Sequence, residues 1–321
     1  MTVRRLMAWR FVLVGLIFGL PTLASAGEPP RIVTTIPPVH SLVAAVTEGI
    51  VDPVLIVRGG SSPHAYAMAP SDARALQNAQ LIVWIGPALE SFVARALRNA
   101  SDGRRVITLM DQGRVALLET RAGGTFDNHE HEHGVDHEDG SHDEDSVARF
   151  DSHLWLDPLN AARTVEVVAD ALIDLDPERA QTYRANAART LDRIARLDQT
   201  LAATLAPVRH RPFVVFHDAY QYLEHHYGLT VAGSITVTPD RKPGARRLRE
   251  IQERIVQAGV VCVFAEPQFH PSVLDTVIEG TTARAGTADP LGAALEPGPG
   301  LYAKLMVSLA QSLADCLAPR S

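Results

Sequence analysis

Short, continuously apolar runs alternate with longer helical segments along most of this chain, and this alternation constrains its fold more than any other feature. Runs typical of strands lie at residues 31–36, 54–57, 81–85 and 106–109, and again at 213–216, 230–234 and 260–265. Helical patterns lie between them, among them residues 39–47, 71–78 and 246–257. Apolar strands separated by helices form parallel sheets with both faces covered. We therefore predict an α/β fold with two lobes, each a mainly parallel sheet flanked by helices.

A long helix is expected between the two groups of strands. Residues 177–205 contain no Gly and no internal Pro, and apolar side chains recur every three or four positions. Asp176 before Pro177 is typical of a helix N-terminus, with Asp as the N-cap. A helix of about 29 residues is about 43 Å long. We therefore expect one long, rigid α-helix to join the two lobes.

The first 26 residues are typical of a secretory signal peptide. Arg4, Arg5 and Arg10 precede an apolar run at residues 11–20, and residues 24–26 (Ala-Ser-Ala) form a cleavage site. The apolar run is about half as long as a membrane-spanning helix. We therefore expect export of a soluble mature chain. The expected organisation is a signal peptide (1–26), an N-terminal lobe (27–175), a connecting helix (176–206) and a C-terminal lobe (207–321).

Export determines how the cysteines are interpreted. Cys262 and Cys316 are the only two in the chain, and an oxidising compartment favours a disulfide between them. Closing a loop of this size stabilises a protein by about 4 kcal/mol on the chain-entropy model. The alternative, a redox-active or metal-binding thiol pair, would need closer spacing or a basic environment. We therefore predict a structural disulfide.

Residues 126–145 form a separate segment rich in histidine and acidic residues. They contain nine acidic residues, no Lys or Arg, and five of the chain's 13 histidines: His129, His131, His133, His137 and His142. Such a composition cannot form a core. Imidazole binds zinc, copper and nickel, and carboxylates attract cations, so we expect a loop with low-affinity, exchangeable metal sites. The alternative is a solvated acidic loop with incidental histidines.

The acidity of the chain belongs mostly to this segment. The formal charge is −7, but removal of the three signal arginines and the nine acidic residues of the loop leaves −1 on the remainder. No basic cluster occurs outside the signal peptide. The composition therefore argues against a nucleic-acid-binding protein.

Three histidines outside this segment lie near strand ends or strand-to-helix junctions. His64 follows a turn-rich stretch, His153 begins the sequence His-Leu-Trp-Leu-Asp-Pro, and His217 ends the run 213–216. Ligands of open α/β sheets bind at the carboxyl ends of strands, so these side chains could converge between the lobes, with Asp289 as an additional carboxylate. The remaining five are interpreted as ordinary residues, with His225 and His226 expected at the surface: His40, His210, His225, His226 and His270.

Several segments resemble the metal-binding proteins of ABC importers. The resemblance is carried by residues 62–64 (Ser-Pro-His) with 69–72, by 153–158, by 216–220, by 264–269 and by 289–292. It extends from about residue 31 to residue 317, interrupted by the acidic histidine segment, and is closest to the periplasmic zinc-binding proteins of the ZnuA type. The resemblance implies two α/β lobes, a long connecting helix and a metal site between the lobes.

The resemblance also implies a ligand set. His64, His153 and His217 match the three histidine ligands, and manganese-selective relatives have Glu at the third position. Three imidazoles favour zinc. Asp289 matches an aspartate that is the fourth ligand in some relatives, and water is the alternative. Glu266 could orient a ligand histidine or cap a turn.

The function implied by the resemblance is high-affinity zinc uptake. A periplasmic solute-binding protein would capture Zn²⁺ between its lobes and deliver it to an ABC permease in the inner membrane. We expect a monomer that is not an enzyme, with a periplasmic zinc chaperone as a candidate second partner. One alternative is a secreted zinc hydrolase, since three His and a water also form a catalytic zinc site, although no His-Glu-x-x-His signature is present. The other is a metal buffer without a permease.

Overall fold

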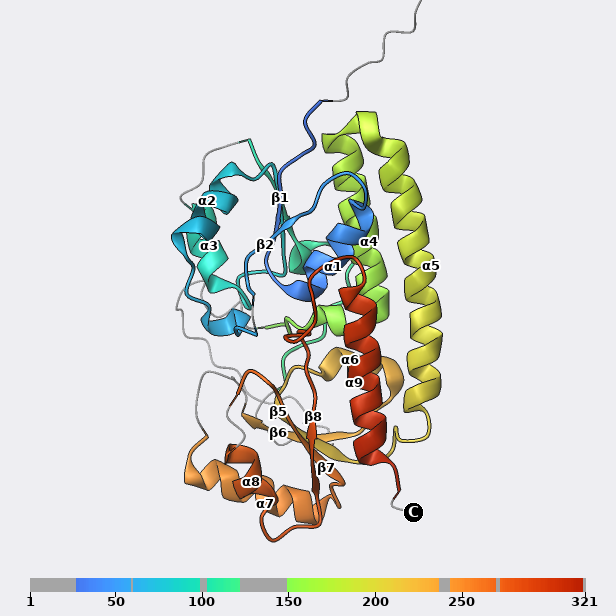
Figure 1. Ribbon diagram of the computed structural model, residues 1–321. Coiled ribbons are helices and arrows are strands. Elements are labelled where there is room, and N and C mark those ends of the chain that lie inside the picture. Colours follow the sequence, from blue (N-terminus) through green and yellow to red (C-terminus); the bar gives the residue numbers. More distant parts are fainter. Residues whose placement is uncertain are drawn as a thin grey trace, which may run out of the picture.

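The computed structural model contains two lobes, stacked one above the other in Figure 1, each built on a four-stranded parallel sheet. The structure describes residues 27–58, 60–98, 103–121, 149–236, 243–269 and 272–319. The predicted signal peptide lies outside these residues. Within these ranges, no helix combines the length and apolar character that crossing a membrane requires.

The N-terminal lobe has the strand order β2-β1-β3-β4. Its strands are β1 (Ile32–Thr34), β2 (Val54–Leu55), β3 (Leu81–Trp84) and β4 (Arg105–Thr108). Helices lie on both sides of this sheet (Figure 1): α1 (Pro37–Val46), α2 (Pro70–Asn78), α3 (Ser91–Arg98) and α4 (Pro158–Leu175). All four strands were expected from their apolar runs. The parallel pairing confirms the predicted class of sheet.

The C-terminal lobe repeats this pattern with the order β6-β5-β7-β8. Its strands are β5 (Phe213–His217), β6 (Val231–Thr236), β7 (Cys262–Ala265) and β8 (Arg284–Thr287). Its helices are α6 (Gln221–Tyr227), α7 (Ala245–Gln257), α8 (Ser272–Ile278) and α9 (Leu301–Leu317). The sequence did not indicate β8, because this edge strand has no apolar run. It contains Gly286, where a Cβ atom would lie 2.5 Å from the Phe264 ring.

The long connecting helix is confirmed as α5 (Ala180–Leu205), which runs along the side of both lobes in Figure 1. Its 26 residues correspond to about 39 Å. A short 3-10 helix, η5 (Pro177–Arg179), precedes it. Asp176 is the N-cap residue of η5, with Pro177 after it as expected, but its side chain makes no capping hydrogen bond. Its carboxylate instead accepts hydrogen bonds from Arg179 and from the Tyr183 hydroxyl.

One apolar core extends through both lobes. It includes buried residues of α1, α4, α5 and α9, together with one face of the C-terminal sheet, to which Phe213 and Val215 belong. The opposite face, with Val214 and Phe216, packs in a separate cluster with α7 and α8. This alternation follows from the two-residue period of a strand. The lobes are therefore joined by shared core packing as well as by chain connections.

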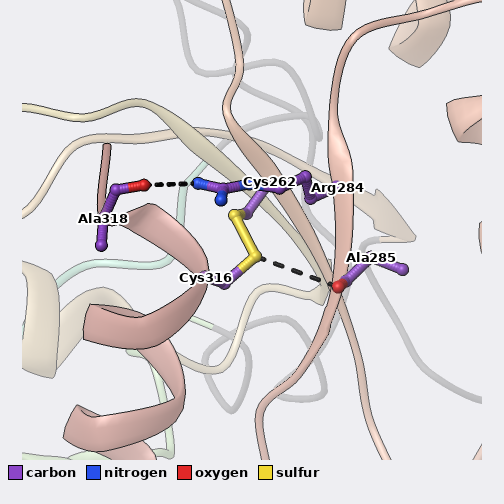
Figure 2. Close-up of a disulfide and its surroundings, with 5 residues drawn as sticks. All are labelled: Cys262, Arg284, Ala285, Cys316 and Ala318. Atoms are coloured by element: carbon purple, nitrogen blue, oxygen red, sulfur yellow. Dashed lines mark hydrogen bonds between the residues drawn. A yellow bond between two sulfur atoms is a disulfide. The ribbon is translucent and has the colours of Figure 1, made fainter. Parts of the chain in front are cut away.

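Helix α9 forms a second bridge between the lobes. At its N-terminal end, the backbone N–H of Tyr302 donates to Ser41 Oγ of α1 (2.9 Å). At its C-terminal end, Cys316 forms a disulfide with Cys262 at the start of β7, and the Arg284 guanidinium donates to the Ala318 carbonyl (2.8 Å; Figure 2). The predicted disulfide is confirmed, and it attaches this helix to the C-terminal sheet.

A buried carboxyl group lies at the carboxyl end of the N-terminal sheet. Glu90 is fully buried, and its carboxyl group accepts the Gly86 N–H (3.0 Å) and the Thr35 hydroxyl, from the segments that follow β3 and β1. Burial disfavours the charged form and raises the pKa of Glu90 to about 7, although these hydrogen bonds oppose the shift. The folded protein therefore favours protonated Glu90 in mildly acidic solution.

The Glu90→Gln variant is expected to lose one source of pH-dependent stability. Because the folded pKa lies above the ordinary value of 4.5, Glu90 ionises in the unfolded chain before it ionises in the folded protein. The free energy of unfolding therefore falls by about 3 kcal/mol as pH rises from 4.5 to about 7. Urea unfolding of the metal-free proteins at pH 4 and pH 8 measures this. The parent should lose about this amount of unfolding free energy between the two pH values, and the variant should not lose it. The exposed Glu296→Gln variant is the control. Parallel stability curves for the parent and Glu90→Gln would contradict the expectation.

Candidate metal centre

Three histidines that are distant in the sequence come together between the lobes. His64 lies in the 3-10 helix η1 (Pro63–Ala65), between β2 and α2, and His153 directly precedes the 3-10 helix η4 (Leu154–Leu156). His217 is the last residue of β5. One ring nitrogen from each lies within 4.8 Å of the others. Two histidines therefore come from the N-terminal lobe and one from the C-terminal lobe.

The strand order of the C-terminal sheet brings Glu266 to His217. Strands β5 and β7 are neighbours, but the chain continues from β5 to one edge of the sheet and from β7 to the other. Ligands of open α/β sheets bind at such a reversal of strand order. Val215 pairs with Phe264, so His217 is level with Glu266, the residue after β7. His217 Nδ1 lies 2.5 Å from Glu266 Oε1, and both residues are buried.

His153 has a carboxylate partner that the sequence analysis missed. Asp151 Oδ1 lies 2.7 Å from His153 Nδ1 and also accepts the backbone N–H of His153 (2.9 Å). An Asp two residues before a candidate ligand is a local signal that could have identified this pair. A carboxylate that accepts from Nδ1–H holds the tautomer and orients Nε2 toward a metal.

These two pairs direct the Nε2 atoms of both rings into one cavity. The Nε2 atoms of His153 and His217 are 3.3 Å apart. Two nitrogen ligands of a tetrahedral zinc ion with bonds of about 2.0–2.1 Å are about 3.3–3.4 Å apart. The structure therefore already holds these two nitrogens at the separation that a zinc ion requires.

His64 completes the group from a third direction. Its ring centroid is 5.5 Å from that of His153 and 5.8 Å from that of His217. Its buried Nε2 has no hydrogen-bond partner among the described residues. Burial, with the neighbouring His153 and His217, holds the pKa of His64 well below its ordinary value, so its ring is neutral and can bind a cation.

His217 has the opposite shift. Burial alone would lower its pKa, but the Glu266 carboxylate outweighs burial and raises the pKa of His217. A cation at Nε2 competes with this proton, so metal binding at His217 releases a proton in acidic solution. The adjacent carboxylate then interacts with the metal-bound imidazole instead of an imidazolium.

The structure does not bring Asp289 into this group. The cavity is about 10 Å³ in volume, and its lining includes the three histidines, Ser62, Trp155, Glu266 and Gln268, without Asp289. The Asp289 carboxylate accepts three backbone N–H groups, from Leu291 and Gly292 at Oδ1 and from Ala293 at Oδ2. Asp289 lies just after β8, and its oxygens hold the following loop.

The acidic histidine segment lies outside the described residues, with His129, His131, His133, His137 and His142. The residues that flank it lie beside α6 of the other lobe. Arg121 pairs with Asp218 (3.1 Å) and Glu224 (2.7 Å), and Asp218 directly follows His217. The backbone of Glu119 forms a bridge with Phe150. Arg121, the last described residue before this segment, therefore contacts the residue that follows His217.

His226 is not the surface residue that the sequence suggested. Its Nδ1 lies 2.9 Å from Asp157 Oδ1, its Nε2 lies 2.9 Å from Asp198 Oδ1, and its side chain is only 15% exposed. Asp157 caps α4, and Asp198 belongs to α5. The hydrogen bond with Asp157 is the main cause that raises the pKa of His226. This imidazole joins α6 of the C-terminal lobe to two helices outside it.

The other described histidines do not join the centre. His40 is buried, and its Nε2 lies 3.0 Å from the Pro53 carbonyl oxygen. His210 and His225 are exposed. His270 lies outside the described residues.

Comparison with known proteins gives a consistent result across nearly the whole chain. The family model described as "Zinc-uptake complex component A periplasmic" (ZnuA) matches residues 32–316. The high-affinity zinc uptake system protein ZnuA of Brucella abortus is 42% identical over 310 residues, which cover 91% of this chain and 93% of the relative. The ZnuA protein of Yersinia pestis is 33% identical, with 92% of each chain covered.

Solved structures agree with the sequence comparison. A crystal structure of ZnuA is similar with a TM-score of 0.75 and 25% identity, covering 91% of this chain and all of that one. A ZnuA deletion mutant with zinc bound is similar with a TM-score of 0.74 and 25% identity, covering 92% of this chain and all of that one.

Proposed function

This chain belongs to the ZnuA family of periplasmic zinc-uptake components, and from that membership we propose that His64, His153 and His217 bind the Zn²⁺ ion that it carries. The protein is a periplasmic zinc-binding component of high-affinity zinc uptake by an ABC transporter, and its partner is the ABC permease. The proposal assigns the cargo site to these side chains. The observation that carries it is the convergence of three imidazole nitrogens in one cavity.

The chemistry of the centre favours zinc. All three candidate ligands are imidazoles, which bind borderline metals better than the hard cations that prefer oxygen. Asp151 and Glu266 orient two of them, and such outer partners typically improve metal affinity by about 10–100-fold. The separation of the His153 and His217 nitrogens suits tetrahedral zinc.

The position of the centre suits capture and release. His64 and His153 belong to one lobe and His217 to the other, so the bound ion bridges the lobes and favours their closed arrangement. A zinc bond of about 2.0–2.1 Å tolerates little stretching. A small separation of the lobes at the permease would therefore release the ion.

The acidic histidine segment would collect zinc for this centre. Its flanking residues lie beside Asp218, next to His217, so captured ions would be concentrated near the site. Its composition predicts low-affinity, exchangeable sites, since ordering a chain segment around an ion costs conformational entropy. We propose further that the protein acts as a monomer, with a periplasmic zinc chaperone as an additional partner.

Deletion of residues 126–145 should separate the two kinds of site. Calorimetric titration of the metal-free protein with Zn²⁺ should show one tight equivalent plus weaker equivalents for the full chain. The deletion variant should show the tight equivalent alone, because the three-histidine centre lies outside the deleted segment. A variant with the five loop histidines replaced by Asn keeps the length and charge and serves as the control.

Two results would overturn parts of this proposal. Absence of a tight equivalent in the full chain would contradict the assigned zinc centre. Loss of the tight equivalent on deletion would place the main site in the loop.

A further inference from the structure

Three buried polar atoms around the metal cavity have no hydrogen-bond partner among the described residues. They are His64 Nε2, Ser62 Oγ and Gln268 Oε1, and all three residues line the cavity. Zinc binding accounts for the His64 nitrogen. A buried polar atom without a partner costs about 1–3 kcal/mol. The Ser62 and Gln268 oxygens therefore indicate that a second, hydrogen-bonding group occupies the cavity with the metal.

The direction of the Gln268 amide follows from simple chemistry. Gln268 Nε2 lies 3.1 Å from Asp289 Oδ1. A carboxylate can only accept hydrogen bonds, so the amide NH₂ must face Asp289 and the amide oxygen must face away from it. Asp289 is itself held by the three backbone N–H groups that follow it. The carboxylate thus fixes which end of the amide is available to the cavity.

The turn that carries Gln268 is anchored to His217 on both sides. Glu266, two residues earlier, pairs with His217 Nδ1, and its carbonyl accepts the Phe269 N–H (3.1 Å). The Phe269 ring stacks on Phe216 (4.6 Å between centroids) and lies edge-on to His217 (6.0 Å). The amide is therefore positioned by the same segment that orients a candidate zinc ligand.

We propose that Gln268 and Ser62 hold a water molecule in the fourth coordination position of the Zn²⁺ ion, and that Asp289 is the positioning residue for the Gln268 amide. This inference rests on the proposed three-histidine zinc site. A zinc-bound water has two O–H groups to donate, and the two unpartnered oxygens are its acceptors.

Charge balance supports a neutral fourth ligand. The two carboxylates Asp151 and Glu266 are buried and hydrogen-bonded to candidate ligands, so together they offset the two positive charges of the ion. Direct ligation by Asp289 would add a third buried negative charge, which is costly unless it is paired. It would also take the carboxylate from its backbone N–H groups. Water at this position avoids both costs.

The test is a double-mutant cycle on zinc affinity. Chelator competition should show that Gln268→Leu binds Zn²⁺ about 10-fold more weakly than the parent, the lower end of the effect of outer-sphere partners. Ser62→Ala should weaken binding in the same direction. Asp289→Asn alone should weaken zinc binding. Added to Gln268→Leu, it should weaken zinc binding no further, because Asp289 acts through the Gln268 amide.

The control is Gln311→Leu, which breaks the equivalent amide–carboxylate contact with Asp315 on the exposed face of α9. Its affinity should equal that of the parent. Visible absorption of the Co²⁺-loaded proteins gives a second readout, and the band positions should change in Gln268→Leu but not in Gln311→Leu. The melting temperature of each metal-free variant checks the fold.

Equal affinities for Gln268→Leu and Gln311→Leu would overturn the proposal. So would an Asp289→Asn loss of the same size in both backgrounds, which would identify Asp289 as a direct ligand. A parent protein without tight zinc binding would instead contradict the zinc centre itself, so the two failures are distinguishable.

Discussion

The His153→Ala variant is expected to bind Zn²⁺ about 10²–10³-fold more weakly than the parent. The apparent binding free energy of a four-ligand protein zinc site is about 10–16 kcal/mol, or roughly 3–4 kcal/mol for each ligand. Each 1.4 kcal/mol corresponds to about a tenfold change in affinity. The variant also leaves Asp151 buried without its imidazole partner.

Chelator competition at neutral pH measures this effect. His64→Ala and His217→Ala should fall in the same range, because each removes one nitrogen from the same group. His225→Ala, which removes an exposed histidine of α6, is the matched control and should bind as the parent does. A His153→Ala protein with parental affinity would place the zinc site elsewhere.

Removal of the disulfide is expected to lower the free energy of unfolding by about 4 kcal/mol. Cys262 and Cys316 are 54 residues apart, and the chain-entropy model assigns about this value to a loop of that length. Cys262 lies in β7 and Cys316 in the last turn of α9, so the bond attaches the end of this helix to the sheet (Figure 2). Its loss should loosen the C-terminal lobe at the end of the chain.

Urea unfolding of the metal-free Cys262→Ala/Cys316→Ala protein tests this value. Alanine is chosen because Cys262 is fully buried and a serine hydroxyl there would add its own desolvation cost. The reduced parent should unfold at the same urea concentration as the variant, and the oxidised parent should unfold at a higher urea concentration. Coincident unfolding of the oxidised and reduced parent would show that the bond contributes nothing measurable.

The sequence correctly predicted those elements whose pattern lies within a short stretch of the chain. Among the described residues, seven of the eight strands follow apolar runs, and α5 follows the three-to-four spacing of its apolar side chains. The missed strand, β8, lies at a sheet edge and contains Gly286, so neither hydrophobicity nor β-propensity marks it. Asp176 occupies the expected N-cap position, but its side chain does not cap the helix, since a nearby arginine and tyrosine bind the carboxylate.

The residues of the metal centre likewise divide into those that the sequence identified correctly and one that it did not. His64, His153 and His217 were predicted as ligands from their places in the chain and from a family resemblance, and the structure brings them together. Asp289 was predicted on the same basis but is not among the residues that line the cavity. The direction of the Asp289 carboxylate depends on which N–H groups lie nearest to it in the folded protein, and a sequence motif does not contain this information.

By itself, the sequence determined the class of fold, the long helix and the cysteine pair, because each depends on residue type and spacing along the chain. It identified the three histidines as ligands through a family resemblance together with their places in the chain. The tertiary structure alone decided the partners of those residues. Glu266 meets His217 through the register of two strands, and Gln268 turns its oxygen away from Asp289. Hydrogen bonds between segments depend on sheet order and side-chain direction, which arise only when the chain has folded.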